Sequence, residues 1–237
     1  MKIHSNFTQH QSGFSLVEMA IVLAIVALLL GGLLPTISGQ IEQQRRNETR
    51  KQLEEVKESL FGFAISKGYL PCPASQVNGI EDRNGGTLQC NNRVGFLPSA
   101  TLGVNRTDGW GRLLHYSVTP AFSTASGVFS TSTPGDITIK NLDGSILSNY
   151  IPTVVLSHGV NGIYGTLESG TTISPLAPNT YPNVANQQTN ANTTGTTFFS
   201  SDPITRTAND DENFDDIVVW ISPNILINRM VSAGRLP

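Results

Sequence analysis

The stretch Ser12-Gly13-Phe14-Ser15-Leu16-Val17-Glu18-Met19 decides how this chain is built. It opens an apolar run that continues to Leu34, and about 20 apolar residues are the length that a helix needs to span a bilayer. Glu18 lies inside this run as a single carboxylate. A charged side chain at the centre of a membrane helix costs roughly 2.5–3.5 kcal/mol on insertion scales, so Glu18 needs a compensating partner. A cut after Gly13 would supply one, because it exposes the α-amino group of Phe14 on a neighbouring copy.

Two simpler interpretations of this run are a secretory signal peptide and a plain membrane anchor. A signal peptide has an apolar core of about 7–15 residues followed by a small-residue cut site, whereas this run is longer and its cut site precedes it. A plain anchor fits the length of the run but gives no reason for Glu18.

Residues Gly13 to Pro35 resemble the processing site of type IV pilins and type II secretion pseudopilins. Members of that superfamily have a Gly before the cut, a Phe after it, a Glu at the fifth mature position and often a helix-kinking proline, as here (Gly13, Phe14, Glu18 and Pro35). The resemblance implies that a prepilin peptidase cleaves between Gly13 and Phe14 and methylates the new amine. It also implies that Phe14 and Glu18 pair during assembly of a filament.

The composition fits one exported domain beside the apolar run. With 237 residues, 14% charged residues and a formal net charge of −3, the chain is neither a nucleic-acid coat nor an acidic disordered tail. Cys72 and Cys90 enclose a Gly/Asn-rich segment, and in an exported domain we expect them to form a disulfide worth about 3 kcal/mol. A metal site at these cysteines is less favoured, because no further Cys and no nearby His completes a ligand set.

The resemblance and the paired cysteines place the C-terminal domain outside the cytoplasm. We expect a single pass of the bacterial inner membrane with a periplasmic head, and later a periplasmic pseudopilus or a cell-surface pilus. The positive-inside rule points the other way, because Lys2 precedes the span and four basic residues follow it (Arg45, Arg46, Arg50 and Lys51). The implied partners are other pilin or pseudopilin subunits, prepilin peptidase, an inner-membrane assembly platform and membrane lipid.

The patterns predict an α+β fold: a long N-terminal α-helix, transmembrane in its first half, packed on a small antiparallel β-sheet head, with a short C-terminal helix. The second half of the long helix has one apolar face for the head (Leu53, Val56, Leu60, Phe63 and Ala64). Gly68 ends this helix. The predicted segments are a cleaved leader, a transmembrane or filament-core helix, an amphipathic helix and the head (1–13, 14–35, 36–67 and 68–237).

Four stretches of the head are typical of strands (113–118, 137–140, 153–157 and 217–221). Residues 166–209 are rich in Ser, Thr, Asn, Gln and Pro and predict a variable surface loop, which Phe198 and Phe199 interrupt as a short strand. Ser222 followed by Pro223 predicts the start of the terminal helix, and Gly234 follows its end. That helix either packs on the head or offers a contact surface to another subunit.

Three segments of the head also resemble pseudopilin heads. Asp108 to Tyr116 is similar to an Asp-x-Trp-Gly turn, Leu156 to Gly162 to a Leu-Gly-x-Asp-Gly turn, and Asp210 to Asp216 to an acidic segment before the last strand. In major pseudopilins the later turn and the acidic segment surround calcium. The resemblance therefore implies a calcium site in which Asp215 and Asp216, together with Asp210 or Asp211, supply carboxylates and Leu156 or Ser157 supplies a backbone carbonyl. The alternative is a solvated turn that caps the strand, because His158 and Asn161 depart from the family pattern.

The sequence shows no signature of catalysis. Ser157 and His158 are adjacent and would point to opposite faces of a strand, and the chain has no Gly-x-Ser-x-Gly, P-loop, Gly-x-Gly-x-x-Gly or His-Glu-x-x-His motif. We expect no enzymatic activity and no cofactor besides calcium. The predicted function is a structural filament subunit, as a minor pilin or a pseudopilin; the alternative is a minor pilin that acts as an adhesin or DNA-uptake module. No nucleic-acid partner is expected, because the head's arginines are scattered among turns (Arg83, Arg93, Arg106 and Arg112).

Overall fold

The computed structural model describes residues 13, 15–174, 182–192, 194–201 and 213–237. The chain divides into two compact units, Met1–Gln43 and Gln44–Pro237, and the second unit is the predicted head together with the helix that it packs on.

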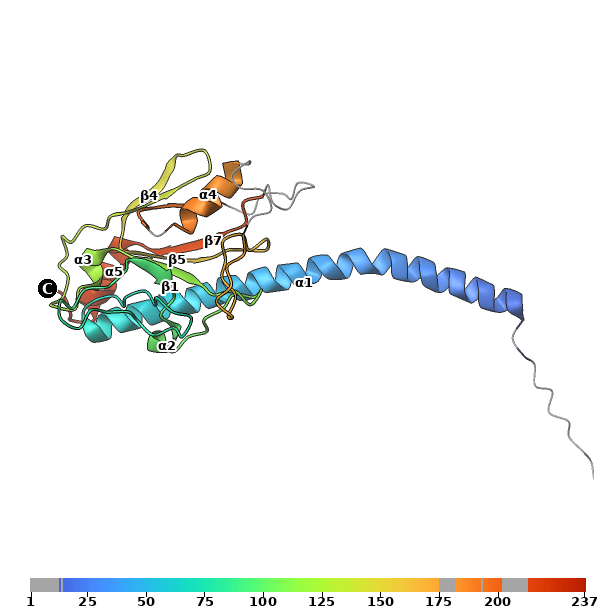
Figure 1. The fold of residues 1–237 in the computed structure, drawn as a ribbon, viewed down its shortest axis with the longest axis horizontal. Helices are drawn as coiled ribbons and strands as arrows, with labels where there is room; N and C mark the ends of the chain where they lie inside the picture. The colour runs from blue at the N-terminus through green and yellow to red at the C-terminus, as the bar shows by residue number, and fades with distance from the viewer. Residues whose placement is uncertain (1–12, 14, 175–181, 193, 202–212) are drawn as a thin grey trace, which may run out of the picture. The chain divides into compact units, whose positions relative to one another are not determined.

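The predicted long N-terminal helix is confirmed as α1 (Leu16–Lys67) (Figure 1). It ends where the sequence predicts, because Gly68 adopts φ +88° and its N–H donates to the carbonyl of Ala64 at 2.7 Å. A glycine in the left-handed conformation at this position terminates a helix at no steric cost. Within the described residues, no helix has both the length and the apolar character that crossing a membrane requires. Phe14, at the start of the predicted span, lies outside the described residues.

A four-stranded antiparallel sheet forms the centre of the head. Its strands lie in the order β1, β2, β5, β7 (Val94–Phe96, His115–Val118, Thr153–Ser157 and Ile217–Ile221). The strands predicted at 153–157 and 217–221 have the predicted bounds. The strand predicted at 113–118 begins later, at His115, because Leu113 forms only an isolated bridge with Thr107.

The predicted antiparallel sheet is therefore present, and a second sheet of three strands accompanies it. Its order is β4, β3, β6 (Ile146–Ile151, Ile137–Lys140 and Thr197–Phe199), and β3 pairs antiparallel with β4 but parallel with β6. The predicted strands at 137–140 and around Phe198 and Phe199 are thus confirmed. Parallel pairing requires a long crossover connection, and the chain between β3 and β6 supplies it.

Within the described residues, four shorter helices accompany the sheets: α2, α3, α4 and α5 (Ser99–Leu102, Pro120–Ser123, Pro182–Asn190 and Pro223–Ser232). The predicted loop over 166–209 is therefore wrong where α4 lies, while residues 175–181, 193 and 202–209 of it lie outside the described residues. The polar composition of α4 hid it, since Gln187 and Asn190 are fully buried through hydrogen bonds rather than apolar packing.

The predicted C-terminal helix is confirmed as α5, and it packs on α1. Leu226 and Met230 are buried in the same core as the second half of α1. Arg229 forms a two-pronged ion pair with Glu58, both contacts at 3.0 Å. Arg235 follows α5 and donates to the last carbonyls of α1, those of Ile65 and Ser66, at 2.6 Å.

The central sheet is the middle layer of the head, with a core on each face. On one face the predicted apolar side of α1 packs against Tyr116, Val155 and neighbouring residues (α1 supplies Leu53, Val56, Leu60 and Ala64). On the other face Val154 and Leu156 pack against the second sheet, whose buried residues are Ile137, Ile139, Ile151 and Phe198. Because side chains alternate along a strand, β5 serves both cores and is buried throughout.

The predicted disulfide between Cys72 and Cys90 is present, with Cα atoms 5.2 Å apart. Arg83 lies within the loop that this bond closes and donates to the carbonyls of Leu88 and Ser123. Arg83 also forms an ion pair with Glu81 at 3.1 Å. The loop is therefore held by covalent and polar contacts rather than by a core of its own.

Candidate functional site

Glu18, the predicted assembly carboxylate, caps the start of α1 within its own chain. The N–H of Ser15 donates to Glu18 Oε2 at 3.3 Å, and the N–H of Glu18 donates to Ser15 Oγ at 3.2 Å. This reciprocal arrangement is a capping box, for which Ser-x-x-Glu is the sequence signal. The signal stands at positions 15 to 18, and the sequence analysis missed it. Pairing of Glu18 with the amine of Phe14 stays a prediction, because Phe14 lies outside the described residues.

Apolar side chains of the first unit are exposed. Leu16 is 92% exposed and Leu28 is 79% exposed. Other exposed apolar side chains lie between them (Val17, Met19, Ile21, Val22, Leu23, Ile25 and Val26). Water does not favour a helix surface of this composition, so another apolar medium or surface is needed to cover it.

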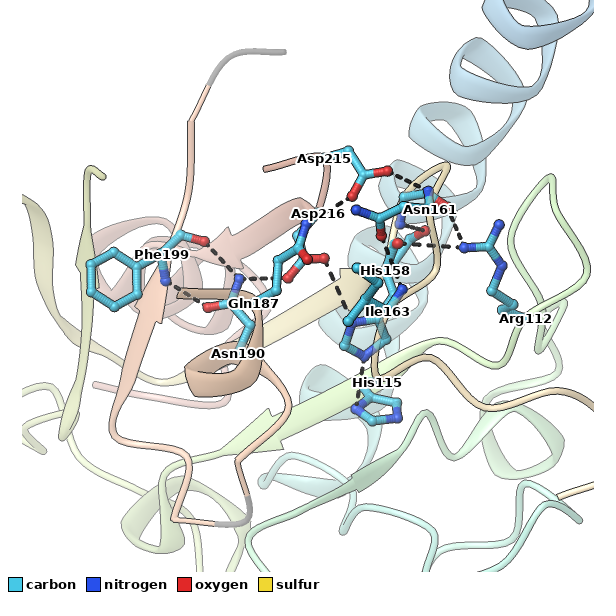
Figure 2. A network of polar contacts seen from close by, with 12 residues as sticks. Arg112, His115, His158, Asn161, Ile163, Gln187, Asn190, Phe199, Asp215 and Asp216 are labelled. Atoms are coloured by element: carbon cyan, nitrogen blue, oxygen red, sulfur yellow. Dashed lines mark hydrogen bonds and ion pairs between the residues drawn. The ribbon is translucent and has the colours of Figure 1, made fainter. Parts of the chain in front are cut away.

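A second candidate site lies in the head, where the three segments that resemble pseudopilin heads converge (Figure 2). Asp108 lies in the turn before β2, the segment from His158 to Gly162 follows β5, and Asp215 and Asp216 precede β7. The strands β2, β5 and β7 are antiparallel neighbours, and His115 lies opposite Leu156, which lies opposite Val218. The register of the sheet therefore brings the three segments together at the same end of these strands.

Asp108 organises the first turn. Its Oδ1 accepts the backbone N–H groups of Trp110 and Arg112, both at 2.9 Å, and its Oδ2 accepts the hydroxyl of Ser157 at 2.7 Å. The next residue, Gly109, lies against α1, where a Cβ atom would come within 2.6 Å of the carbonyl oxygen of Arg45. The Asp-Gly pair thus holds the turn both to β5 and to the helix.

Arg112 fixes the second turn. Its buried guanidinium donates from Nη1 to the carbonyl of Gly159 at 2.7 Å and from Nη2 to that of Val160 at 2.9 Å. Burial lowers the pKa of Arg112, and the charge of Asp108 opposes that shift. Gly162 has φ +64°, and a Cβ atom there would overlap Nη1 of Arg112. The sequence analysis counted Arg112 among scattered cations and missed this role, because its partners lie more than forty residues away.

Two histidines and an aspartate form a row at this turn, in which His158 and Asp216 are buried and His115 is half-buried (Figure 2). His158 Nε2 lies 3.4 Å from His115 Nδ1, and His158 Nδ1 lies 3.6 Å from Asp216 Oδ1. Neither His158 Nδ1 nor Asp216 Oδ1 has a hydrogen-bond partner among the described residues. Burial lowers the pKa of His158 to about 4 and that of His115 to about 3, and it raises the pKa of Asp216 to about 8. Near neutral pH the row is therefore uncharged, with protons on carboxyl rather than imidazolium groups.

Side chains of α4 hold the two aspartates from the other side. Asn190 donates to Asp216 Oδ2 at 2.8 Å and also pairs with both backbone groups of Phe199 in β6. Gln187 donates to Asp215 Oδ1 at 3.0 Å, and the N–H of Asn161 donates to Asp215 Oδ2 at 2.6 Å. Burial, together with the neighbouring Asp216, raises the pKa of Asp215 to about 7. The sequence analysis missed Gln187 and Asn190 because they lie in its predicted loop.

The described members of the predicted calcium set do not assemble as ligands of an ion. Asp215 and Asp216 accept amide protons, the hydroxyl of Ser157 donates to Asp108, and Leu156 lies in the paired strand β5. No group of three or more His, Cys, Asp or Glu within the described ranges could hold a metal ion. Asp210 and Asp211, the other two predicted ligands, lie outside the described residues. The calcium site therefore stays a prediction.

Comparison with known proteins bears on the N-terminal site. Residues 8–34 match the prokaryotic N-terminal methylation motif. This motif is the prepilin leader of type IV pilins and pseudopilins, and the matched residues contain Gly13, Phe14 and Glu18. It supports a pilin- or pseudopilin-like subunit that prepilin peptidase processes and that is first anchored in a membrane. The comparison with curated proteins gives no match, and neither does the comparison with solved structures.

Proposed function

We propose that this chain is a structural subunit of a filament, either type IV pilus-like or a type II secretion pseudopilus, and that it assembles through α1. The methylation motif at residues 8–34, followed directly by the exposed apolar side chains of α1, is the observation that carries the proposal. In the membrane, lipid would cover these side chains. In the filament, the helices of neighbouring subunits would cover them instead.

The Cys72–Cys90 disulfide supports a head that folds in an oxidising compartment, which for a bacterial inner-membrane protein is the periplasm. The subunit would therefore cross the inner membrane once, with its head in the periplasm, until an assembly platform draws it into the filament. The head's role in this proposal is to surround the filament core, because its own core uses the second half of α1 and leaves the first half to other contacts.

Glu18 would fix the stagger between subunits. In the single chain its carboxylate accepts the N–H of Ser15, a neutral donor at 3.3 Å. A methylated Phe14 amine from an adjacent subunit offers a positive charge, and charge-assisted hydrogen bonds are roughly twice as strong as neutral ones. A slipped subunit would bury the carboxylate without that charge, which is penalised in an apolar environment.

Substitution of Glu18 tests the proposal. We expect Glu18→Leu and Glu18→Gln to be cleaved and methylated normally but to enter filaments about tenfold less than the wild type, equivalent to about 1.4 kcal/mol. Glu18→Gln is informative because an amide oxygen keeps the capping box with Ser15 and removes only the charge. Intact-mass analysis reports processing, and quantitative immunoblots of sheared filaments report incorporation. Glu55→Gln, on the exposed surface of α1, is the control.

Two outcomes would contradict the proposal. Normal filament content of Glu18→Leu would show that the carboxylate has no role in assembly. A native protein that retains residues 1–13 would show that the leader is not removed.

A further inference from the structure

A cavity of about 470 Å³ opens beside the second site, and none of its lining residues belongs to residues 8–34, which match the methylation motif. Its walls come from α1, from β4 and the connection before it, from the residues that follow β6, and from β7 with the residues before it. All of these belong to the unit Gln44–Pro237. Small-molecule sites enclose about 300–1,000 Å³, so the cavity is large enough for a ligand of one or two rings.

One wall of the cavity is cationic. Arg50 is exposed, and its guanidinium forms no hydrogen bond or ion pair with any described residue. Arg46 lies one helical turn earlier and lines the same cavity. Guanidinium groups bind carboxylates through parallel hydrogen bonds, which makes this wall suited to an organic acid.

The acidic residues of the cavity do not cancel this charge. Asp215 and Asp216 precede β7; both oxygens of Asp215 accept hydrogen bonds, from Asn161 and Gln187, and Asp216 Oδ2 accepts one from Asn190. Burial raises the pKa of both carboxyl groups, to about 7 and about 8, so much of their charge is lost at neutral pH. Among the described residues that line the cavity, the guanidinium groups are thus the main fixed charges.

The remaining walls offer a flat apolar surface and neutral polar groups. Trp220 is half-buried in β7, and Leu147, which is 50% exposed, lies in β4. Asn141 and Ser200 add an amide and a hydroxyl, which can each donate and accept hydrogen bonds. An indole face beside polar groups suits a ligand that has an apolar ring face and hydroxyl groups around its rim.

We propose that this cavity binds an anionic carbohydrate, that is, a sugar ring bearing a carboxylate. Arg50, with Arg46, binds the carboxylate; Trp220 packs on the face of the ring; Asn141 and Ser200 bind its hydroxyl groups. A neutral sugar would leave Arg50 unused, and a small inorganic anion would leave Trp220 uncovered. This binding is independent of the filament role, since none of these residues belongs to the leader or to the first unit.

Fluorescence titration of the full chain in sugar-free detergent micelles tests the proposal. The chain has two tryptophans, so a Trp110→Phe background makes Trp220 the single reporter. Digalacturonic acid is the probe, its methyl ester is the uncharged analogue with the same rings, and inorganic phosphate is the simple anion. We expect a saturable change in Trp220 emission with the acid, binding at least about tenfold weaker with the ester, and no emission change with phosphate.

Variants assign the binding to this cavity. Arg50→Gln is expected to weaken binding of the acid about tenfold or more, and it is exposed on a helix where glutamine is tolerated. Arg106→Gln, at an exposed arginine that pairs with Glu168 away from the cavity, should bind as the wild type does. Any one of four results would overturn the proposal. These are no saturable binding, equal binding of the acid and the ester, competition by phosphate at equal concentration, and an unchanged affinity in Arg50→Gln. None of these outcomes would bear on assembly through Glu18.

Discussion

Asp216 and His158 face each other across 3.6 Å, and their protonation affects stability in opposite senses. Folding raises the pKa of Asp216 from 3.8 to about 8, so the folded head binds a proton that the unfolded chain releases. That contribution to stability is lost as pH rises through 8. Folding lowers the pKa of His158 from 6.5 to about 4 and that of His115 to about 3, so stability is lost as pH falls below 6.5.

The head should therefore become more stable as the pH falls from about 9 to about 6.5 and gain nothing further below that. In Asp216→Asn the alkaline part of this dependence should flatten and the melting temperature at pH 9 should rise, because a neutral amide replaces a buried carboxylate. Differential scanning fluorimetry across pH measures this. Asp143→Asn is the control, because Asp143 is exposed and folding lowers its pKa instead. An unchanged alkaline slope in Asp216→Asn would contradict the assignment.

Gly144 and Gly162 both have left-handed backbones, but at only one of the two would an added side chain also collide with a neighbouring residue. Gly144 has φ +86° with open space around its Cα atom, whereas Gly162 has φ +64° and directly faces Arg112. We expect Gly144→Ala to lower the free energy of unfolding by about 1–2 kcal/mol, the cost of a left-handed alanine. Gly162→Ala should cost about 3 kcal/mol or more, because Arg112 must also leave its carbonyl partners. Urea denaturation of both variants measures the difference, and equal losses would rule out the packing argument.

At the scale of elements, a single hydroxyl connects α1 to the first turn of the site. Thr49 is buried; its Oγ1 donates to the carbonyl of Arg45 and accepts the N–H of Gly109, both at 2.9 Å. Gly109 belongs to the same turn as Asp108, which in turn holds Ser157 of β5. The helix, the turn and the sheet are therefore fixed through consecutive hydrogen bonds.

Thr49→Val should lower the free energy of unfolding by about 1–2 kcal/mol, because the N–H of Gly109 loses its partner while the shape of the side chain is kept. Thr189→Val in α4 is the matched control, since among the described residues that hydroxyl bonds only the carbonyl four residues earlier, at Ala185. The control should change stability by no more than about 0.5 kcal/mol. Urea denaturation compares the two, and similar losses would mean that the contact with Gly109 contributes nothing.

The sequence predicts correctly those helices and strands that are determined by residues within the element or next to it. Gly68 ends α1 through its own backbone, and the β-branched runs of β5 and β7 are strands wherever they pack. The helix α4 could not be found in this way, because Gln187 and Asn190 are buried by partners distant in sequence. The same holds in the site: Asp108 and Asp216 stand in recognisable segments, whereas Arg112 takes its role from a turn that only the folded sheet brings near it.

At the scale of the whole molecule, the two units have different requirements for stability. The core of the head includes Leu53, Val56 and Leu60 of α1, so the head is complete without the first unit. The exposed apolar side chains among the described residues of the first unit gain nothing from the head's core.

A fragment from Gln44 to Pro237 should therefore be folded and monomeric without detergent, whereas a fragment that begins at Gly68 should not fold, because it lacks one side of the core. Near-ultraviolet circular dichroism and size-exclusion chromatography of both fragments, prepared under oxidising conditions, test this. An aggregated or non-cooperative Gln44 fragment would show that the head depends on the first unit.

The contact between α5 and α1 determines when, during synthesis, the core of the head can be completed. Glu58 and Arg229 are 171 positions apart, and Leu226, Met230 and Leu236 share a core with Leu53. A nascent chain consequently carries an unfinished apolar surface until residues 226–236 have left the ribosome, and chaperones must shield that surface until then. A nonsense codon at position 226 would leave that surface permanently open and expose the product to proteolytic clearance.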